Sequence, residues 1–214
     1  MTIKRIDLAS LLFFLDTVYT LRYTKDMSNR QRILEIGLVL FAQNGYEATG
    51  VQEICDRAEI TKPTLYHYFG NKQGLLESIL EERFKPFLSL LESACHYRRD
   101  LTLNIQRVIE AYFLFASRDL QLYQLLLSLR TGPSRSESRQ IIKPWIAAQE
   151  QAIMAMFKAA ERQHGNMRGR SKAYMISLLG VINAYVQQAL EDRLALDDEL
   201  AQQARHQFMH GIFS

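Results

Sequence analysis

The chain has 214 residues, of which 48% are hydrophobic and 23% charged, and its formal net charge is +3. These values are ordinary for a folded globular protein of one or two domains and disfavour disorder. Ten glycines and four prolines are few, which disfavours a turn-rich all-β fold. The two cysteines, Cys55 and Cys95, form no disulfide framework and fit a reducing cytoplasm. Apolar runs such as Leu11–Leu15 are far too short to span a membrane.

The first 27 residues precede the dense helix signals and form an N-terminal extension. Lys4 and Arg5 lead into the apolar stretch Leu8–Leu15, which superficially matches a secretory signal. Asp16 interrupts the apolar character after Leu15, and no small-residue cleavage site is present. Two interpretations stay open: an extra amphipathic helix, or a start codon placed upstream of a true start at Met27.

Three helices, one longer and two short, are predicted from Ser28 onward. Ser28 is a suitable cap for the first, and Gly45 is placed to end it in a left-handed conformation. Thr49 opens a capping box for the second helix. Thr61 caps a third helix that has Pro63 in its first turn, where a missing N–H costs nothing. Two short helices joined by a tight turn and supported by a longer one form a helix-turn-helix.

Residues 30–76 closely resemble the DNA-binding domain of the tetracycline-repressor (TetR) family of bacterial regulators. The positions that match in register are Ile33, Leu34, Leu40, Phe41, Gly45, Tyr46, Thr49, Ile54, Ala58, Thr64, Leu65, Tyr66, Phe69, Lys72 and Leu75. The resemblance implies an all-α chain. It has a three-helix helix-turn-helix domain at residues 28–72 and a helical effector-binding and dimerisation domain at residues 73–214.

Three residues depart from the family pattern. Gly37 stands where the first helix usually has alanine, and Gly50 replaces a hydroxyl residue at the start of the second helix. Glu59 occupies the turn position that is usually glycine. If that position is left-handed, we expect Glu59 to carry about 1–2 kcal/mol of strain.

The exposed face of the third helix is the predicted DNA-reading surface, because Leu65 and Phe69 turn toward the core. The major groove of B-DNA accepts one helix, whose N-terminal side chains reach base edges. The resemblance implies that Tyr66 and Lys72 contact backbone phosphates. It also implies that base edges are contacted by some of the residues Lys62, Thr64, His67 and Tyr68. The candidate DNA-binding residues are Thr49, Gly50, Lys62, Pro63, Thr64, Tyr66, His67, Tyr68 and Lys72.

The rest of the chain is predicted to be helical, at roughly 73–96, 102–117, 119–130, 138–164, 171–193 and 196–213. The segment Tyr174–Leu190 is apolar nearly all round, so we expect it to be buried on every face. In a domain of this size that requires a second chain. The last helix adds Leu200, Ala204, Phe208 and Ile212 in steps of four.

The resemblance implies that the last two helices pair with their copies in a homodimer. The expected interface residues are Val181, Tyr185, Val186, Leu200 and Phe208.

The resemblance also implies a small-molecule pocket in the second domain. The candidates are aromatic, methionine and amide residues of its central helices: Phe113, Phe115, Tyr123, Trp145, Met154, Tyr174 and Asn183. Plain core packing is the competing interpretation of each. Asn183 is either a pocket group or an interface residue. Nothing in the sequence indicates the effector's identity or charge.

Signals for catalysis, cofactors or metals are weak. His206 and His210 lie one helical turn apart, as two metal ligands would, but no third ligand accompanies them. Cys55 occupies a core position, whereas Cys95, near a helix end, is the better candidate for redox sensing. No nucleophile elbow or phosphate loop is present. We therefore expect no enzyme, no cofactor and no metal site.

The predicted function is a homodimeric, cytoplasmic, ligand-responsive transcriptional repressor. It binds a palindromic DNA operator, is released by a small molecule, and has no membrane partner. The alternative is a helical interaction protein of the same fold without sequence-specific DNA binding. Charge keeps this alternative open, because residues 28–72 have a net charge of zero whereas residues 131–172 carry +5.

Overall fold

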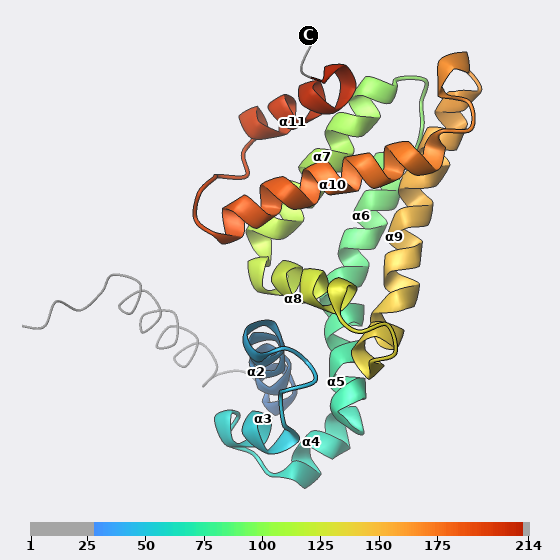
Figure 1. Cartoon of the computed structure of the whole chain (residues 1–214). Coiled ribbons are helices and arrows are strands. Elements are labelled where there is room, and N and C mark those ends of the chain that lie inside the picture. Colours follow the sequence, from blue (N-terminus) through green and yellow to red (C-terminus); the bar gives the residue numbers. More distant parts are fainter. Residues whose placement is uncertain (1–27, 212–214) are drawn as a thin grey trace, which may run out of the picture.

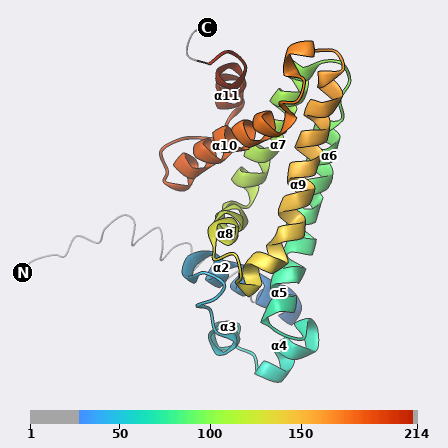
Figure 2. The same cartoon turned by 45° about the vertical axis from the view of Figure 1, so that its right-hand side comes forward.

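The computed structural model describes residues 28–211, and all regular structure within that range is helical. The extension at residues 1–27 and Ile212 lie outside the described residues. Helices α2–α4 lie at one end of the molecule, and α10 and α11 lie at the other (Figures 1 and 2). The predicted all-α fold is confirmed.

Three helices make up the N-terminal unit: α2 (Asn29–Asn44), α3 (Val51–Arg57) and α4 (Lys62–Phe69). Ser28 caps α2 by accepting a hydrogen bond from the backbone N–H of Gln31. Gly45 ends the helix at a φ of +83°, which glycine adopts without steric penalty. Both termini of α2 therefore form as the sequence predicts.

The predicted capping box at Thr49 is wrong. The cap position of α3 is Gly50, which has no side chain to fill it. Thr49 is only 1% exposed, and its hydroxyl donates to the carbonyl of Leu40 at 3.2 Å and of Gly45 at 2.8 Å. It thus ties the loop to the end of α2, because a buried hydroxyl must find a partner.

Two of the unusual residues have a structural explanation. Glu59 has a φ of +51°, so it is left-handed as expected and carries the strain of a side chain there. Gly37 lies where α2 meets α5 (Lys72–Ile79), and a Cβ at this position would come 2.8 Å from Cδ2 of Leu75. Glycine therefore permits the close approach of these two helices.

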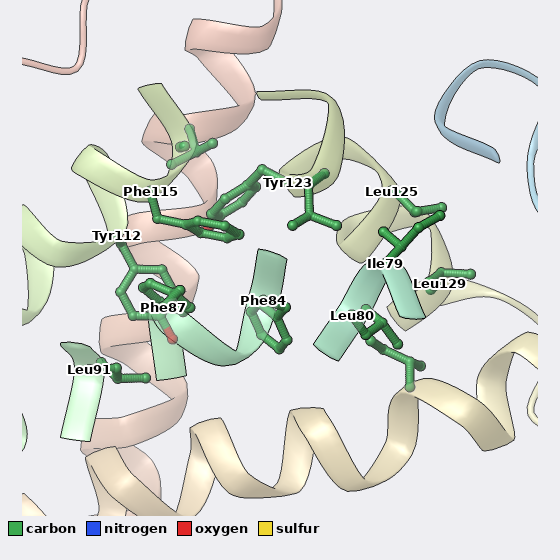
Figure 3. Close-up of a cluster of buried hydrophobic side chains, with 14 of the residues drawn as sticks. Ile79, Leu80, Phe84, Phe87, Leu91, Tyr112, Phe115, Tyr123, Leu125 and Leu129 are labelled. Atoms are coloured by element: carbon green, nitrogen blue, oxygen red, sulfur yellow. The ribbon is translucent and has the colours of Figure 1, made fainter. Parts of the chain in front are cut away.

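A continuous helical rod connects the N-terminal unit to the rest of the molecule. It consists of α5, the π-helical turn η2 (Leu80–Phe84) and α6 (Lys85–Cys95). The carboxamide of Asn71 caps its start by accepting from the N–H of Gly74 at 2.8 Å. The sequence predicts a single helix over this range and gives no sign of the π turn. Figure 3 shows that the buried residues Ile79, Leu80 and Phe84 continue along this rod.

The remaining helices form the body, together with α6. They are α7 (Leu101–Arg118), α8 (Leu120–Thr131), α9 (Glu137–Glu161), the short 3-10 turn η3 (Gly165–Met167), α10 (Ser171–Leu190) and α11 (Asp198–His210). Side-chain caps start four of them, at Asp100, Asp119, Ser136 and Asp197. The predicted helix bounds agree with these to within a few residues.

Helix α10 is only partly buried within the subunit. Its length and mean hydropathy of 1.2 would allow a membrane span, although core helices of soluble proteins pass the same test. Only 28% of its apolar window is buried. Ile182 and Val186 face the core, whereas Ile176 is 56% exposed. Within residues 28–211, no other element covers this exposed side.

Candidate nucleic-acid interface and internal cavity

Helix α4 presents an exposed face directed away from the core. Leu65 and Phe69 are buried and fix the orientation of the helix. The side chains of Lys62, Pro63, Tyr66, His67 and Tyr68 are exposed, and Thr64 is half-buried. Tyr66 and Tyr68 are 45% and 40% exposed. Large aromatic side chains left in water on one short helix mark a contact surface rather than a core element.

Two of the predicted DNA-contacting side chains, those of Thr49 and Lys72, bind backbone carbonyls within the subunit. Thr49 is buried and occupied by carbonyl groups. The ammonium of Lys72 donates to the carbonyls of Tyr46 at 2.9 Å and Thr49 at 3.1 Å, and it lies 4.2 Å from the centre of the Tyr46 ring. Lys72 therefore holds the loop before α3 with two of the three N–H donors of its ammonium, and both partners are neutral carbonyls that leave its charge uncompensated. Gly50 remains exposed at the start of α3.

The exposed face of α4 carries one lysine, Lys62, whose ammonium makes no ion pair within the described residues. Arg30, by contrast, pairs with Glu82. Lys62 stands at the first position of α4, at the end of the helix that enters a DNA groove in helix-turn-helix proteins. An unpaired cation there is available for a base edge or a phosphate.

An enclosed cavity of about 30 Å³ lies inside the body. A volume of this size holds about one water molecule. Aromatic rings of Phe84, Phe115 and Tyr123 form part of its wall, and Figure 3 shows these three rings around one centre. The polar residues that line it are Tyr112, Arg130, Gln149 and Asn183.

Hydrogen bonds organise the polar side of the cavity. The hydroxyl of Tyr123 donates to Oδ1 of Asn183 at 2.7 Å, and the amide of Gln149 donates to the hydroxyl of Tyr112. Burial raises the pKa of both tyrosines above the ordinary value, so both stay neutral. The cavity therefore offers neutral hydrogen-bonding groups between aromatic walls, next to Arg130, whose guanidinium pairs with Glu150 at 2.8 Å.

The structure brings together only some of the predicted pocket residues. Phe115, Tyr123 and Asn183 line the enclosed cavity. The other four lie elsewhere: Phe113 packs against Tyr185, Tyr174 packs against Phe157, Met154 is half-buried outside the cavity, and Trp145 lines a separate open groove of about 900 Å³ between α5 and α9.

Eight residues that line the cavity were not predicted: the aliphatic Leu126, Leu127, Ile142 and Ile146, and the aromatic or polar Phe84, Tyr112, Arg130 and Gln149. Gln149 had a usable signal, because it falls on the same helical face as Ile142, Ile146 and Ile153. A polar residue on an apolar face indicates a buried polar contact.

The predicted dimer residues also need correction. Val186 is fully buried inside its own subunit, so it cannot face a partner. Phe208 packs on Phe157 with ring centres 6.2 Å apart, and the hydroxyl of Tyr185 donates to Gln207 at 2.7 Å. The exposed strip of α10 consists instead of mostly small residues: Ala173, Ile176, Ser177, Gly180 and Ala184.

The thiols are unsuited to redox sensing. Cys55 and Cys95 are both buried. Burial, with a smaller contribution from Glu92, raises the pKa of the Cys95 thiol to about 12, and burial also raises that of Cys55. The expectation that Cys95 is the better redox candidate is therefore not supported, because a thiol reacts as its thiolate. Within residues 28–211 no group of three or more metal-binding side chains occurs.

Comparison with known proteins gives a family match for the segment from α2 to α5. Residues 33–79 match the model described as bacterial regulatory proteins, tetR family. The transcriptional activator FasR of Mycolicibacterium smegmatis is 26% identical over 190 residues, which cover 86% of this chain and 83% of that protein. Seven other curated relatives are matched over 30–57% of their own length.

Solved structures share the whole fold. A putative fatty acid metabolism regulator of Clostridium perfringens has a TM-score of 0.73 at 16% identity, over 86% of this chain and 99% of that one. FadR of Bacillus subtilis, solved in complex with stearoyl-CoA, has a TM-score of 0.69 at 22% identity, over 85% and 98% of the two chains. At these identities the likeness is one of fold.

Proposed function

We propose which parts of this chain bind DNA, the effector and a second copy, because the chain belongs to the tetR family of bacterial regulatory proteins and is a DNA-binding transcriptional regulator. Two copies bind a palindromic operator through α4, and a small molecule that enters the internal cavity releases them. The helix-turn-helix domain occupies residues 28–72, and the effector-binding and dimerisation domain occupies residues 73–214.

The observation that carries the DNA-binding part is the face of α4. Lys62, His67 and Tyr68 project into solvent while Leu65 and Phe69 hold the helix in place. Side chains near the start of such a helix contact base edges in the major groove. Tyr66 and the backbone at Gly50 are the candidates for phosphate contacts.

The observation that supports the homodimer is the strip of small residues on α10. Gly180 lies at the centre of this strip, and a Cβ added to it would meet nothing within 4 Å. Small residues let two helices approach closely, so that the exposed Ile176 is covered by the partner's α10. Two-fold pairing of this kind explains why an apolar helix is left uncovered in one subunit.

For the effector we propose a long-chain acyl-CoA. Two relatives point to fatty acids: the C. perfringens neighbour is named as a fatty acid metabolism regulator, and FadR was solved with stearoyl-CoA. The aromatic wall of the cavity suits an acyl chain, and the ion pair between Arg130 and Glu150 lies at its polar side. A ligand of this size needs several hundred Å³, so its binding must displace side chains that now close the cavity.

We also propose that the protein acts in the cytoplasm, as a repressor, by binding alone and without catalysis. The test combines a mobility-shift titration and a footprint on the DNA upstream of its own gene. Wild type should protect a palindrome, and the triple variant Lys62→Ala, His67→Ala, Tyr68→Ala should lose that footprint. Stearoyl-CoA should release the DNA, whereas free coenzyme A should not. An unchanged footprint in the triple variant would remove α4 from the interface.

A second candidate is a helical interaction protein that keeps the fold but binds no operator. The zero net charge of residues 28–72 favours it, because DNA affinity draws heavily on phosphate neutralisation. Under this alternative, the wild type would bind all DNA sequences equally weakly in the same titration.

A further inference from the structure

The π-helical turn η2 places two neighbouring side chains against different parts of the molecule. Phe84 is only 2% exposed and lines the internal cavity, with its ring 5.8 Å from that of Phe115 and 6.0 Å from that of Trp145. Figure 3 shows Phe84 and Phe87 on this rod, with Phe115 of α7 near them. Arg83, the preceding residue, is bonded to α2 and to the start of α8 instead. Turns of this type frequently occur at functional sites.

Arg83 bridges the N-terminal unit and the body. One guanidinium nitrogen donates to Glu35 of α2, and the other donates to Oδ2 of Asp119 at 2.8 Å. Burial by itself would lower the pKa of Arg83, but the hydrogen bonds and charges of Asp119 and Glu35 raise it overall. A planar guanidinium can hold two carboxylates in fixed directions, which an ammonium cannot do.

Asp119 connects this bridge to the cavity wall. Its Oδ1 accepts the backbone N–H of Leu122 at 3.1 Å and so caps α8. The next residue of α8, Tyr123, lines the cavity. If the first turn of α8 moves, the carboxylate of Asp119, to which Arg83 is bonded, therefore moves with it. A movement of Phe84 displaces Arg83 itself, because the two residues are adjacent in the chain.

We infer that Arg83 is a positioning residue for DNA binding: it ties α2 of the N-terminal unit to the first turn of α8, so that a change at the cavity reaches α4. The N-terminal unit then follows any shift of η2 or α8 as one body, since α2 also packs against α3 and α4. The inferred effect on operator binding and on the response to the effector rests on the proposed function. The inferred structural role of Arg83, which connects α2 to α8, does not rest on it.

Four full-length variants test this role. Arg83→Gln removes the bridge, and Arg83→Lys keeps the charge but loses the two-carboxylate geometry. Asp119→Asn breaks the ion pair yet keeps the cap, because asparagine caps helices as well as aspartate does. Arg118→Gln is the matched control, since this substitution removes the same charge as Arg83→Gln. Arg118 is exposed and adjacent to Asp119.

Hydrogen exchange measures the tie without DNA or effector. Arg83→Gln should speed exchange of the α2 amides by about tenfold, and Arg118→Gln should leave them at the wild-type rate. Asp119→Asn should speed exchange in α2, although its side chain makes no hydrogen bond to that helix. Combining it with Arg83→Gln should add nothing further, since both act through one contact.

Operator titrations with and without stearoyl-CoA measure the coupling. In Arg83→Gln the ratio of the two affinities should fall roughly tenfold toward one, with partial rescue in Arg83→Lys and a wild-type ratio in Arg118→Gln. The thermal shift caused by stearoyl-CoA should persist in all four variants.

Two results would overturn the inference: wild-type exchange of α2 in Arg83→Gln, or a wild-type affinity ratio in that variant. If wild-type protein binds neither operator nor stearoyl-CoA, the proposed function fails. In that case the exchange rates of α2 alone decide whether Arg83 holds the two parts together.

Discussion

At the scale of single residues, we propose that the exposed side chains of α4 divide into base-reading and phosphate-binding groups. Lys62→Ala and His67→Ala should each weaken cognate operator binding by about 1–3 kcal/mol and relax the preference at one base position. Tyr66→Phe removes only a hydroxyl and should weaken binding to all DNA sequences by the same amount. Binding-site selection with each variant distinguishes the two patterns. An unrelaxed preference in Lys62→Ala and in His67→Ala would argue against base contacts.

The left-handed Glu59 yields a second prediction at this scale. Replacing it by glycine removes the Cβ penalty at a φ of +51°, so Glu59→Gly should stabilise the protein by about 0.5–1 kcal/mol. Glu53→Gly, a helical position in α3, is the control and should destabilise it by a similar amount. Thermal or urea unfolding measures the change in the free energy of unfolding for both variants. A loss of stability in Glu59→Gly would show that Glu59 is not strained.

Lys72 and Thr49 show why residue roles are harder to predict than helices. Both stand at helix starts where a phosphate contact is chemically reasonable. Their side chains are instead taken up by backbone carbonyls around the loop before α3. Which of two available partners a side chain binds depends on the path of the loop, and that path is set by packing rather than by local sequence.

At the scale of helices, α10 gives the clearest test. Ile176→Glu places a carboxylate on the exposed strip, where it should separate the dimer but leave the subunit folded, because that side chain is 56% exposed. Val186→Glu buries an unpaired charge in the subunit core, at a cost of several kcal/mol, and should unfold the chain. Sedimentation and circular dichroism distinguish the two outcomes.

Gln151→Glu is the matched control, since it makes an acidic substitution on an exposed face of α9. It should stay dimeric and folded. A dimeric Ile176→Glu variant would show that α10 is covered by something other than its own copy.

Helix bounds could be predicted because caps and apolar periodicity are local properties of the chain. The orientation of α10 could not, since a helix that is apolar nearly all round gives no indication of which side meets the core. The π turn at Leu80–Phe84 escaped prediction for a related reason. One extra residue in a turn changes no local pattern, and only the packing of Phe84 and the contacts of Arg83 reveal it.

At the scale of the whole molecule, function depends on the separation of two N-terminal units. The α2–α4 end lies opposite the α10 and α11 end that we propose for pairing (Figures 1 and 2).

The symmetry of the proposed dimer fixes the spacing of its operator. Two-fold readers place their recognition helices about one DNA turn apart, roughly 34–36 Å, or a multiple of it. Inserting five base pairs between the half-sites turns one of them to the opposite face of the duplex, so only one α4 can bind. Specific affinity should then fall by roughly 100-fold toward the non-specific level, while the salt-dependent non-specific binding stays.

The control for this titration is a substitution of five base pairs at the same place, which changes the sequence but not the spacing. It should have little effect, because the segment between half-sites is not read by α4. If the insertion leaves affinity unchanged, each N-terminal unit binds its half-site independently. A dimer with fixed spacing, and release of DNA by altering that spacing, would then be the wrong account of this protein.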